Sequence, residues 1–337
     1  NKNMALMDDK ASSSDTGGFA SGAALDIGLN NAANGFGVGN KNSIIQSYRT
    51  AARILTSPIT SRVNILVVPG IRDSALSDYI LDRLKDYGKA IYLMDIPSYD
   101  ASDNRLFAGD VNRPSIDKTA ANFAARGVDN NYAATYFPDV RIVDEENNRR
   151  ATVPSSIAAL GALAYNDRVA YPWFAPAGFN RGSLGFVTNL AVRLNQENRD
   201  TLYENRINPI ASFPNAGFVI FGQKTLQILK SSLDRVNVRR MLLEVRRIIG
   251  EVAENIAFEQ NTPTTRSRFV AEVTPLLSLV QSQQGIDQFR VVMDTSNNTQ
   301  TDIENNILNG RIVIVPTRAV EFIAIDFIIT NSGVEFV

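Results

Sequence analysis

Three short apolar runs, separated by helical patterns, limit the fold of this chain more than any other feature of its sequence. They cover residues 63–68, 90–94 and 132–136. The first stops at Pro69-Gly70 and the second at Asp95-Ile96-Pro97, and an apolar run bounded by turn residues is typical of a buried strand. Helical segments between successive buried strands predict a mainly parallel sheet with helices on its faces.

The first of the intervening helices carries start and stop residues. Apolar residues recur at helical spacing over 76–87, with Asp73 or Ser74 placed to cap the first turn and Gly88 to end the helix. Two further helices are predicted, at 116–125 and 153–165. We therefore assign residues 44–205 to a middle α/β domain.

The order of elements changes after residue 205. A strand at 218–221 precedes a long amphipathic helix at about 233–258, and a second helix follows that contains Pro275. Three closing strands are predicted, at 286–293, 311–315 and 319–329. Two long helices on a mainly antiparallel sheet make an α+β domain, which we assign to residues 206–337. Residues 1–43 stand apart as a Gly-, Ala- and Asn-rich loop.

Two absences narrow the function. The chain has no cysteine and no histidine, which excludes disulfides, thiolate nucleophiles, Ser-His-Asp triads and the usual zinc sites. We therefore expect no metal and no cofactor. Lysine plus arginine (34) balance aspartate plus glutamate (35), so bulk attraction to nucleic acid or an anionic membrane is not expected. No signal peptide or membrane span is visible.

An enzyme or nucleotide-binding protein on the α/β domain is the alternative that these absences leave open. The run Gly35-Phe-Gly37-Val-Gly39-Asn-Lys41 lacks the spacing of a phosphate-binding P-loop. Only one glycine, Gly70, follows the first strand, where a dinucleotide fold requires several. Asp95 is therefore interpreted as a helix cap or turn residue, and no nucleotide site is supported.

The long helix carries many arginines. Arg240 and Glu244 are four residues apart, as are Arg247 and Glu251, which predicts ion pairs along one face. A neighbouring strip without acidic residues is formed by Arg235, Arg239, Leu243 and Arg246. A solvated helix face is the ordinary interpretation of such a strip, and a basic contact for an acidic partner is the functional one.

An aromatic segment and the last strand are further candidates for contacts. The segment 171–178 is rich in proline, cannot be a helix or a central strand, and is predicted to be an interdomain hinge or an interface, with a buried structural linker as the alternative. The candidate residues in and just after it are Tyr171, Trp173, Phe174, Asn180 and Arg181. The last strand is predicted to be an edge strand or a strand lent to a neighbour; its candidate residues are Val320, Phe322, Ile325, Phe327, Val334 and Phe336.

Several stretches resemble the tail sheath proteins of contractile-tailed bacteriophages, of the myovirus type that includes T4-like and giant phages. They are YPWFAPAG followed by FNRG (171–182), LYENRINPIASFPNAGFVIFGQKTLQ (202–227), the helical block at 233–270, and GRIVIVPTRAVEFIAIDFIITNSGVEF (310–336). The resemblance covers residues 44–337. The chain lacks an initiator Met and the N-terminal arm of that family, so we expect a fragment, with 1–43 as a remnant of an outer, variable domain.

The resemblance implies a structural subunit and not an enzyme. Sheath subunits form stacked hexameric rings around a tail tube, and the metastable polymer contracts to drive the tube through the host envelope. Implied partners are other sheath subunits, the tube protein, and baseplate and tail-terminator proteins, with no nucleic acid and no membrane. The implied location is the virion tail, after assembly in the host bacterial cytoplasm. The sheath of a phage-tail-like bacteriocin or injection system remains an alternative.

The resemblance also assigns roles to parts of the chain. The C-terminal domain is expected to face the tube. The basic strip, or the rival segment 301–310, is expected to contact the tube or another subunit, and the last strand is expected to exchange between neighbours.

Overall fold

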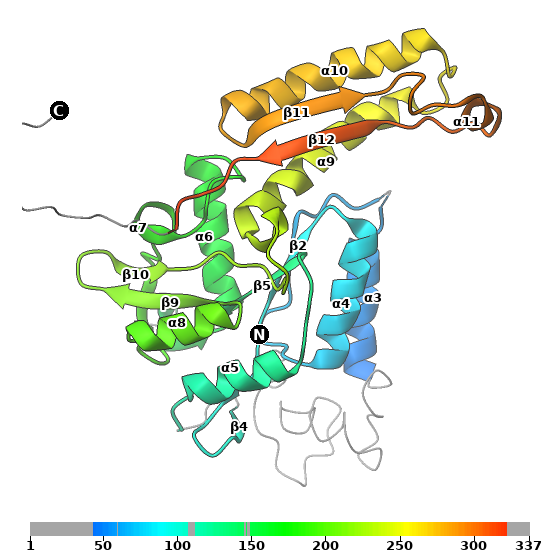
Figure 1. Cartoon of the computed structure of the whole chain (residues 1–337). Coiled ribbons are helices and arrows are strands. Elements are labelled where there is room, and N and C mark those ends of the chain that lie inside the picture. Colours follow the sequence, from blue (N-terminus) through cyan, green and yellow to red (C-terminus); the bar gives the residue numbers. More distant parts are fainter. Residues whose placement is uncertain (1–42, 59, 107–111, 145, 147–148, 322–337) are drawn as a thin grey trace, which may run out of the picture.

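A five-stranded sheet forms the centre of the first part of the chain (Figure 1). The computed structural model describes residues 43–58, 60–106, 112–144, 146 and 149–321. Its strands are β1 (Ile65–Val67), β2 (Ile91–Met94), β5 (Ala133–Phe137), β9 (Ile207–Phe213) and β10 (Gly217–Ile220), in the order β1-β2-β5-β9-β10. The first four strands are parallel and β10 runs antiparallel to β9, so the mainly parallel sheet is confirmed.

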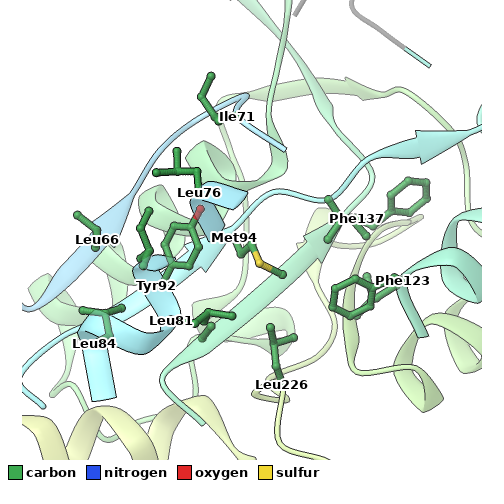
Figure 2. Packing of buried hydrophobic residues seen from close by; sticks show 14 of the residues in the cluster. Leu66, Ile71, Leu76, Leu81, Leu84, Tyr92, Met94, Phe123, Phe137 and Leu226 are labelled. Atoms are coloured by element: carbon green, nitrogen blue, oxygen red, sulfur yellow. The ribbon is translucent and has the colours of Figure 1, made fainter. Parts of the chain in front are cut away.

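Helices cover both faces of this sheet because its central strands are apolar on both sides. Tyr92 and Met94 of β2 point into one core, and Ile91 and Leu93 point into the other. The first face is covered by α3 (Ser43–Leu55), α4 (Ser74–Tyr87), α5 (Ile116–Ala125) and α8 (Gln196–Glu204), and the second by α6 (Ser155–Val169) and the start of α9. Figure 2 shows Tyr92 and Met94 packed among side chains of the first core.

The start and stop residues of α4 act as the sequence predicts. The Asp73 side chain accepts a hydrogen bond of 2.8 Å from the amide of Ala75. Gly88 ends the helix in the left-handed conformation, with φ of 62°, and its amide donates to the carbonyl of Leu84. The 14-residue helix is therefore fixed at both ends by local chemistry.

Asp95 is a structural cap, as expected. Pro154 precedes α6 and provides no side-chain cap, and Asp95 supplies one from the end of β2. Its carboxylate accepts hydrogen bonds from the amide of Ser156 at 3.0 Å, the hydroxyl of Ser156 at 2.7 Å and the amide of Gly70 at 2.9 Å. One buried carboxylate thus joins the ends of β1 and β2 to the start of α6.

Several smaller elements were not predicted. They are the pair β3 (Ser98–Tyr99) and β4 (Arg105–Leu106), the antiparallel sheet of β7 (Arg149–Val153), β6 (Val140–Asp144) and β8 (Val187–Leu190), and the short helix α7 (Gly178–Arg181). The three-stranded sheet continues from the end of β5 and packs Val140 and Val187 against the second core. It therefore extends the first part of the chain at the carboxyl end of its main sheet.

The last part of the chain is the expected α+β unit. Its elements are α9 (Val236–Ile256), α10 (Pro263–Ser282), β11 (Ile286–Val292), α11 (Gln300–Glu304) and β12 (Arg311–Pro316). β11 and β12 form an antiparallel pair over the two long helices, and α11 lies at the far tip (Figure 1). α10 runs through Pro275. Residues 319–321 are not in a strand, and the rest of the predicted third strand lies outside the described residues, as does 1–42.

The predicted domain boundary after residue 205 is wrong. β9 pairs with β5 and β10 pairs with β9, so the central sheet is complete only at Ile220. Leu226 is also part of the first core, and its amide donates to the carbonyl of Ala133. The first unit therefore includes residues 207–226.

Candidate assembly sites

Glu321, the last described residue, is clamped between the first unit and the residue that precedes α9. Its carboxylate accepts two hydrogen bonds from Arg235, at 2.6 Å from Nε and 2.9 Å from Nη2. The Tyr203 hydroxyl donates at 2.8 Å and Gln223 Nε2 at 3.1 Å. Arg235 precedes α9, Tyr203 lies on α8 and Gln223 follows β10, so three separate elements converge on one side chain.

The clamp keeps Glu321 ionised in a groove. Burial alone would raise the pKa of Glu321, but the hydrogen bonds from Arg235 and Tyr203 outweigh it and lower that pKa. The groove beside the clamp has a volume of about 890 Å³ and is lined by α8, the start of α9 and residues 318–321. Residue 321 is therefore a fixed point of the chain.

The β11–β12 pair is a second candidate for contacts. Within the described residues, neither strand has another neighbour, so both outer edges have unpaired backbone groups. Ile312 and Ile314 face the helices, whereas Val313 and Val315 on the other face are each 46% exposed. A two-stranded sheet with free edges and exposed valines is a suitable template for an added strand.

The predicted strand-exchange residues are only partly described. Val320 is exposed next to the clamp. Phe322, Ile325, Phe327, Val334 and Phe336 lie outside the described residues. Their role therefore stays a prediction.

The aromatic segment lies where the two units join. Trp173 packs in the core of the C-terminal unit, and its Nε1 donates to the carbonyl of Gln283 at 2.9 Å. Tyr171 stacks on Trp173 with ring centroids 5.0 Å apart, and the Arg181 guanidinium lies 5.0 Å from the ring centroid of Phe174. Asn180 is exposed on α7. These contacts make the segment part of the packing between units.

An ion pair that sequence reasoning missed also links the units. Arg240 of α9 is buried and pairs with Asp167 of α6 at 2.5 Å. The predicted pair between Arg240 and Glu244 is wrong: Glu244 pairs with Arg247 at 2.6 Å instead. The predicted pair between Arg247 and Glu251 is confirmed at 2.8 Å. No local signal could identify Asp167, because it lies 73 residues earlier in the chain.

The prediction that the basic strip on α9 is exposed is also wrong. Arg239 and Leu243 are each only 6% exposed, and Arg235 is paired with Glu321 and Asp234. Arg246 alone of the four is exposed. α9 packs against the first unit on this side, which an analysis of the helix by itself does not include. A role for these residues in contacts with the tube or a subunit stays a prediction.

The described residues also bear on metal binding and on membrane insertion. No group of three or more acidic side chains there is arranged to hold a metal ion. No described helix is both long and apolar enough to cross a membrane.

The fold is that of sheath components of contractile injection machines. The chain is similar to a protein of the anti-feeding prophage baseplate, with a TM-score of 0.65 and 20% identity, covering 83% of this chain and 72% of that one. It is also similar to a chain of the sheath complex of an extracellular contractile injection system in the contracted state. The TM-score is 0.64 and the identity 22%, and the match covers 84% of this chain and 79% of that one.

The chain belongs to the phage tail sheath family. The model for the phage tail sheath protein central domain matches residues 51–226, and the model for the C-terminal domain matches residues 230–330. The tail sheath protein of Vibrio phage KVP40 is 37% identical over 209 residues, which are 62% of this chain and 30% of that protein. The tail sheath protein of Enterobacteria phage T4 is 36% identical over 193 residues, which are 57% of this chain and 29% of that protein. The matched part of the chain thus spans less than a third of either relative.

Proposed function

We propose that the chain is a structural, non-enzymatic subunit of a contractile phage tail sheath. Its relatives are named tail sheath proteins, and its two units match the central and C-terminal sheath models. In this function, subunits stack as helical hexameric rings around a tail tube, between a baseplate and a tail terminator. Contraction of the polymer, assembled in the host cytoplasm and carried in the virion tail, drives the tube through the host envelope.

The proposal is supported by two observations. β11 and β12 have unpaired outer edges within the described residues, and Glu321 is held at a fixed point. Exchange of such segments between subunits keeps a polymer connected while its subunits move. We infer that the C-terminal unit, which begins between residues 226 and 230, faces the tube, with α9 residues or the 301–310 segment as the contact.

A phage is favoured over a phage-tail-like injection device as the source. The two phage relatives are 37% and 36% identical, whereas the injection-system structures are 20% and 22% identical and share the fold. The genes next to the one that encodes this chain test the choice. Capsid and terminase genes are expected there, and their absence from a complete gene cluster would favour the device.

Electron microscopy of purified proteins tests the function. The longer parent protein is expected to form long striated tubes by itself, and the 337-residue chain is expected to remain as single particles. Compact monomers from both would contradict the proposal. Deletion of residues 331–337 from the parent is expected to abolish the tubes, while Trp173 fluorescence reports an intact fold. Normal tubes from that deletion would refute strand exchange through this segment.

A further inference from the structure

The segment between α11 and β12 ends in an asparagine followed by a glycine, Asn309-Gly310. Both residues are exposed, so water reaches them. The backbone nitrogen that follows an asparagine can attack the side-chain carbonyl of that asparagine and close a succinimide ring, and glycine hinders this attack least. A Cβ atom at position 310 would lie 2.8 Å from Cε of Met293, so glycine is also the residue that fits here. Nucleophile and electrophile are thus neighbours in one exposed dipeptide.

Two side-chain amides hold the peptide group that joins these residues. Nδ2 of Asn297 donates to the carbonyl oxygen of Asn309 at 2.8 Å, and Nδ2 of Asn298 donates to the same oxygen at 2.9 Å. The backbone amide of Asn309 donates in turn to Oδ1 of Asn298 at 2.7 Å. Asn298 is only 3% exposed, so its donor is fixed by the surrounding structure. The carbonyl oxygen of Asn309 therefore has two donors already in place.

These donors meet the atom on which negative charge develops when Gly310 reacts. The backbone amide of Gly310 must lose its proton to become a nucleophile, and it donates to no acceptor among the described residues. The resulting charge is shared with the carbonyl oxygen of Asn309, because both atoms belong to one resonant peptide group. Hydrogen bonds to that oxygen therefore stabilise the anionic nitrogen, as the donors of an oxyanion hole stabilise a developing charge.

The side chain of Asn309 is oriented by a carboxylate from α11. Hydrogen bonds from Thr299, with a smaller contribution from the side-chain amide of Asn309, lower the pKa of Asp302. Asp302 is itself fixed, because the amide of Thr299 donates to it at 2.8 Å and the hydroxyl of Thr299 at 2.6 Å. The NH2 group of Asn309, which is the leaving group of the reaction, is thus held by an anchored acceptor.

We propose that Asn309-Gly310 is a self-catalysed deamidation site. The nitrogen of Gly310 gives its proton to water or hydroxide and forms a bond to Cγ of Asn309. The bond between Cγ and Nδ2 then breaks, and the leaving nitrogen takes a proton from water and departs as ammonia, which leaves a succinimide. A water molecule adds to one of the two succinimide carbonyls and opens the ring, which gives aspartate or isoaspartate at position 309.

The reaction changes the charge of the tip of the C-terminal unit, where α11 lies (Figure 1). It adds a carboxylate to segment 301–310 near Asp302, and isoaspartate also lengthens the backbone shortly before β12. The chemistry itself is independent of the proposed function. Its consequence for assembly rests on that function, because 301–310 is one of the candidates for contact with the tube. We expect this contact to change as subunits age.

Mass spectrometry of the intact chain, incubated in mildly alkaline buffer and then digested, tests the site. The readout is the gain in mass when OH replaces NH2 in the peptide that contains Asn309. We expect Asn309 to convert roughly ten-fold faster in the folded chain than in the chain unfolded by guanidinium chloride. Asn34-Gly35 is the same dipeptide elsewhere in the chain, and in the unfolded chain it is expected to react as fast as Asn309. Equal or slower conversion of Asn309 in the folded chain would overturn the proposal.

Removal of one donor gives a second test, in which a purely structural role predicts the opposite result. Asn297→Asp replaces the donating NH2 group by a carboxylate oxygen, and we expect conversion of Asn309 to be about ten-fold slower. If the hydrogen bonds only anchored the segment, this substitution would loosen it and speed the reaction, which would refute the catalytic role. Asn305→Asp is the matched control, because it adds the same charge at an exposed position of the same segment and should leave the rate unchanged. Chain cleavage after Asn309 in place of the gain in mass would also overturn the proposal.

Discussion

The two members of the Arg240–Asp167 ion pair differ in how far they are buried. We therefore expect their removal to lower the free energy of unfolding by different amounts. The Arg240 side chain is 4% exposed and the Asp167 side chain is 31% exposed. Asp167→Ala leaves a buried guanidinium whose remaining hydrogen bond, to the carbonyl of Pro172, is long at 3.5 Å. Removing one partner of a buried pair costs about 3–5 kcal/mol, and we expect about 3 kcal/mol here because water reaches Asp167.

Arg240→Met is expected to cost less than about 1 kcal/mol, because methionine keeps the apolar stem and the uncovered Asp167 is hydrated. In the double variant, the cost of Asp167→Ala should almost disappear, which gives a coupling energy of about 3 kcal/mol.

Urea unfolding followed by Trp173 fluorescence measures these costs. Trp173 is the only tryptophan of the chain and lies at the junction that the ion pair spans. A loss of 3 kcal/mol lowers the urea midpoint by about 1 M for a slope near 3 kcal/mol/M. The control is Arg268→Met, which removes an exposed pair with Glu272 and should leave the midpoint unchanged. Equal costs for Asp167→Ala and Arg240→Met would refute the reasoning.

Four other substitutions test features of the fold, each by thermal unfolding. Asp95→Asn is expected to cost about 2–3 kcal/mol, since its NH2 group replaces one carboxylate oxygen and cannot accept from the donors of Ser156 or Gly70 that this oxygen serves, and a cost near zero would contradict the cap. Glu321→Gln should lower stability at pH 7. Because the folded pKa of Glu321 is lowered, this loss should begin to shrink as the pH falls below the ordinary glutamate value of about 4.3 and should vanish below the folded pKa; a pH-independent loss would exclude the charged clamp. Gly88→Ala should cost about 1–2 kcal/mol, because Gly88 has a φ of 62°. Gly250→Ala should stabilise the fold by about 1 kcal/mol, because Gly250 lies inside α9 and has open space at its Cβ position. Stability changes of the same sign for both substitutions would refute the backbone argument.

Elements fixed by local chemistry could be predicted from the sequence. The predicted bounds 116–125 match α5 residue for residue, since Ser115 caps its start and its apolar residues keep helical spacing. β9 was missed because it contains Asn208 and Pro209, which are unusual in a central strand. Asn208 is nevertheless buried, because its side chain bonds the carbonyl of Thr135 and both backbone groups of Lys224. Partners so far apart in the chain leave no local pattern.

The candidate sites were harder to predict for the same reason. Glu321 meets Arg235 across 86 residues and Tyr203 across 118 residues. Arg239 is covered by Tyr132, which directly precedes β5 and lies more than 100 residues earlier in the chain. The sequence identifies the arginines in and just before α9. Only the tertiary structure shows that Arg235 holds Glu321, that Arg240 pairs with Asp167 and that Arg239 lies against Tyr132.

The position of the clamp also determines how the molecule resists a pull. Tension applied beyond residue 321 reaches Arg235, Tyr203 and Gln223 before it reaches β12. The load passes to the start of α9, to α8 and to the loop after β10, all anchored on the five-stranded sheet. The β11–β12 pair is therefore shielded from this tension, which would otherwise break its backbone hydrogen bonds one after another. Mechanical work is therefore transmitted to the five-stranded sheet and its two cores.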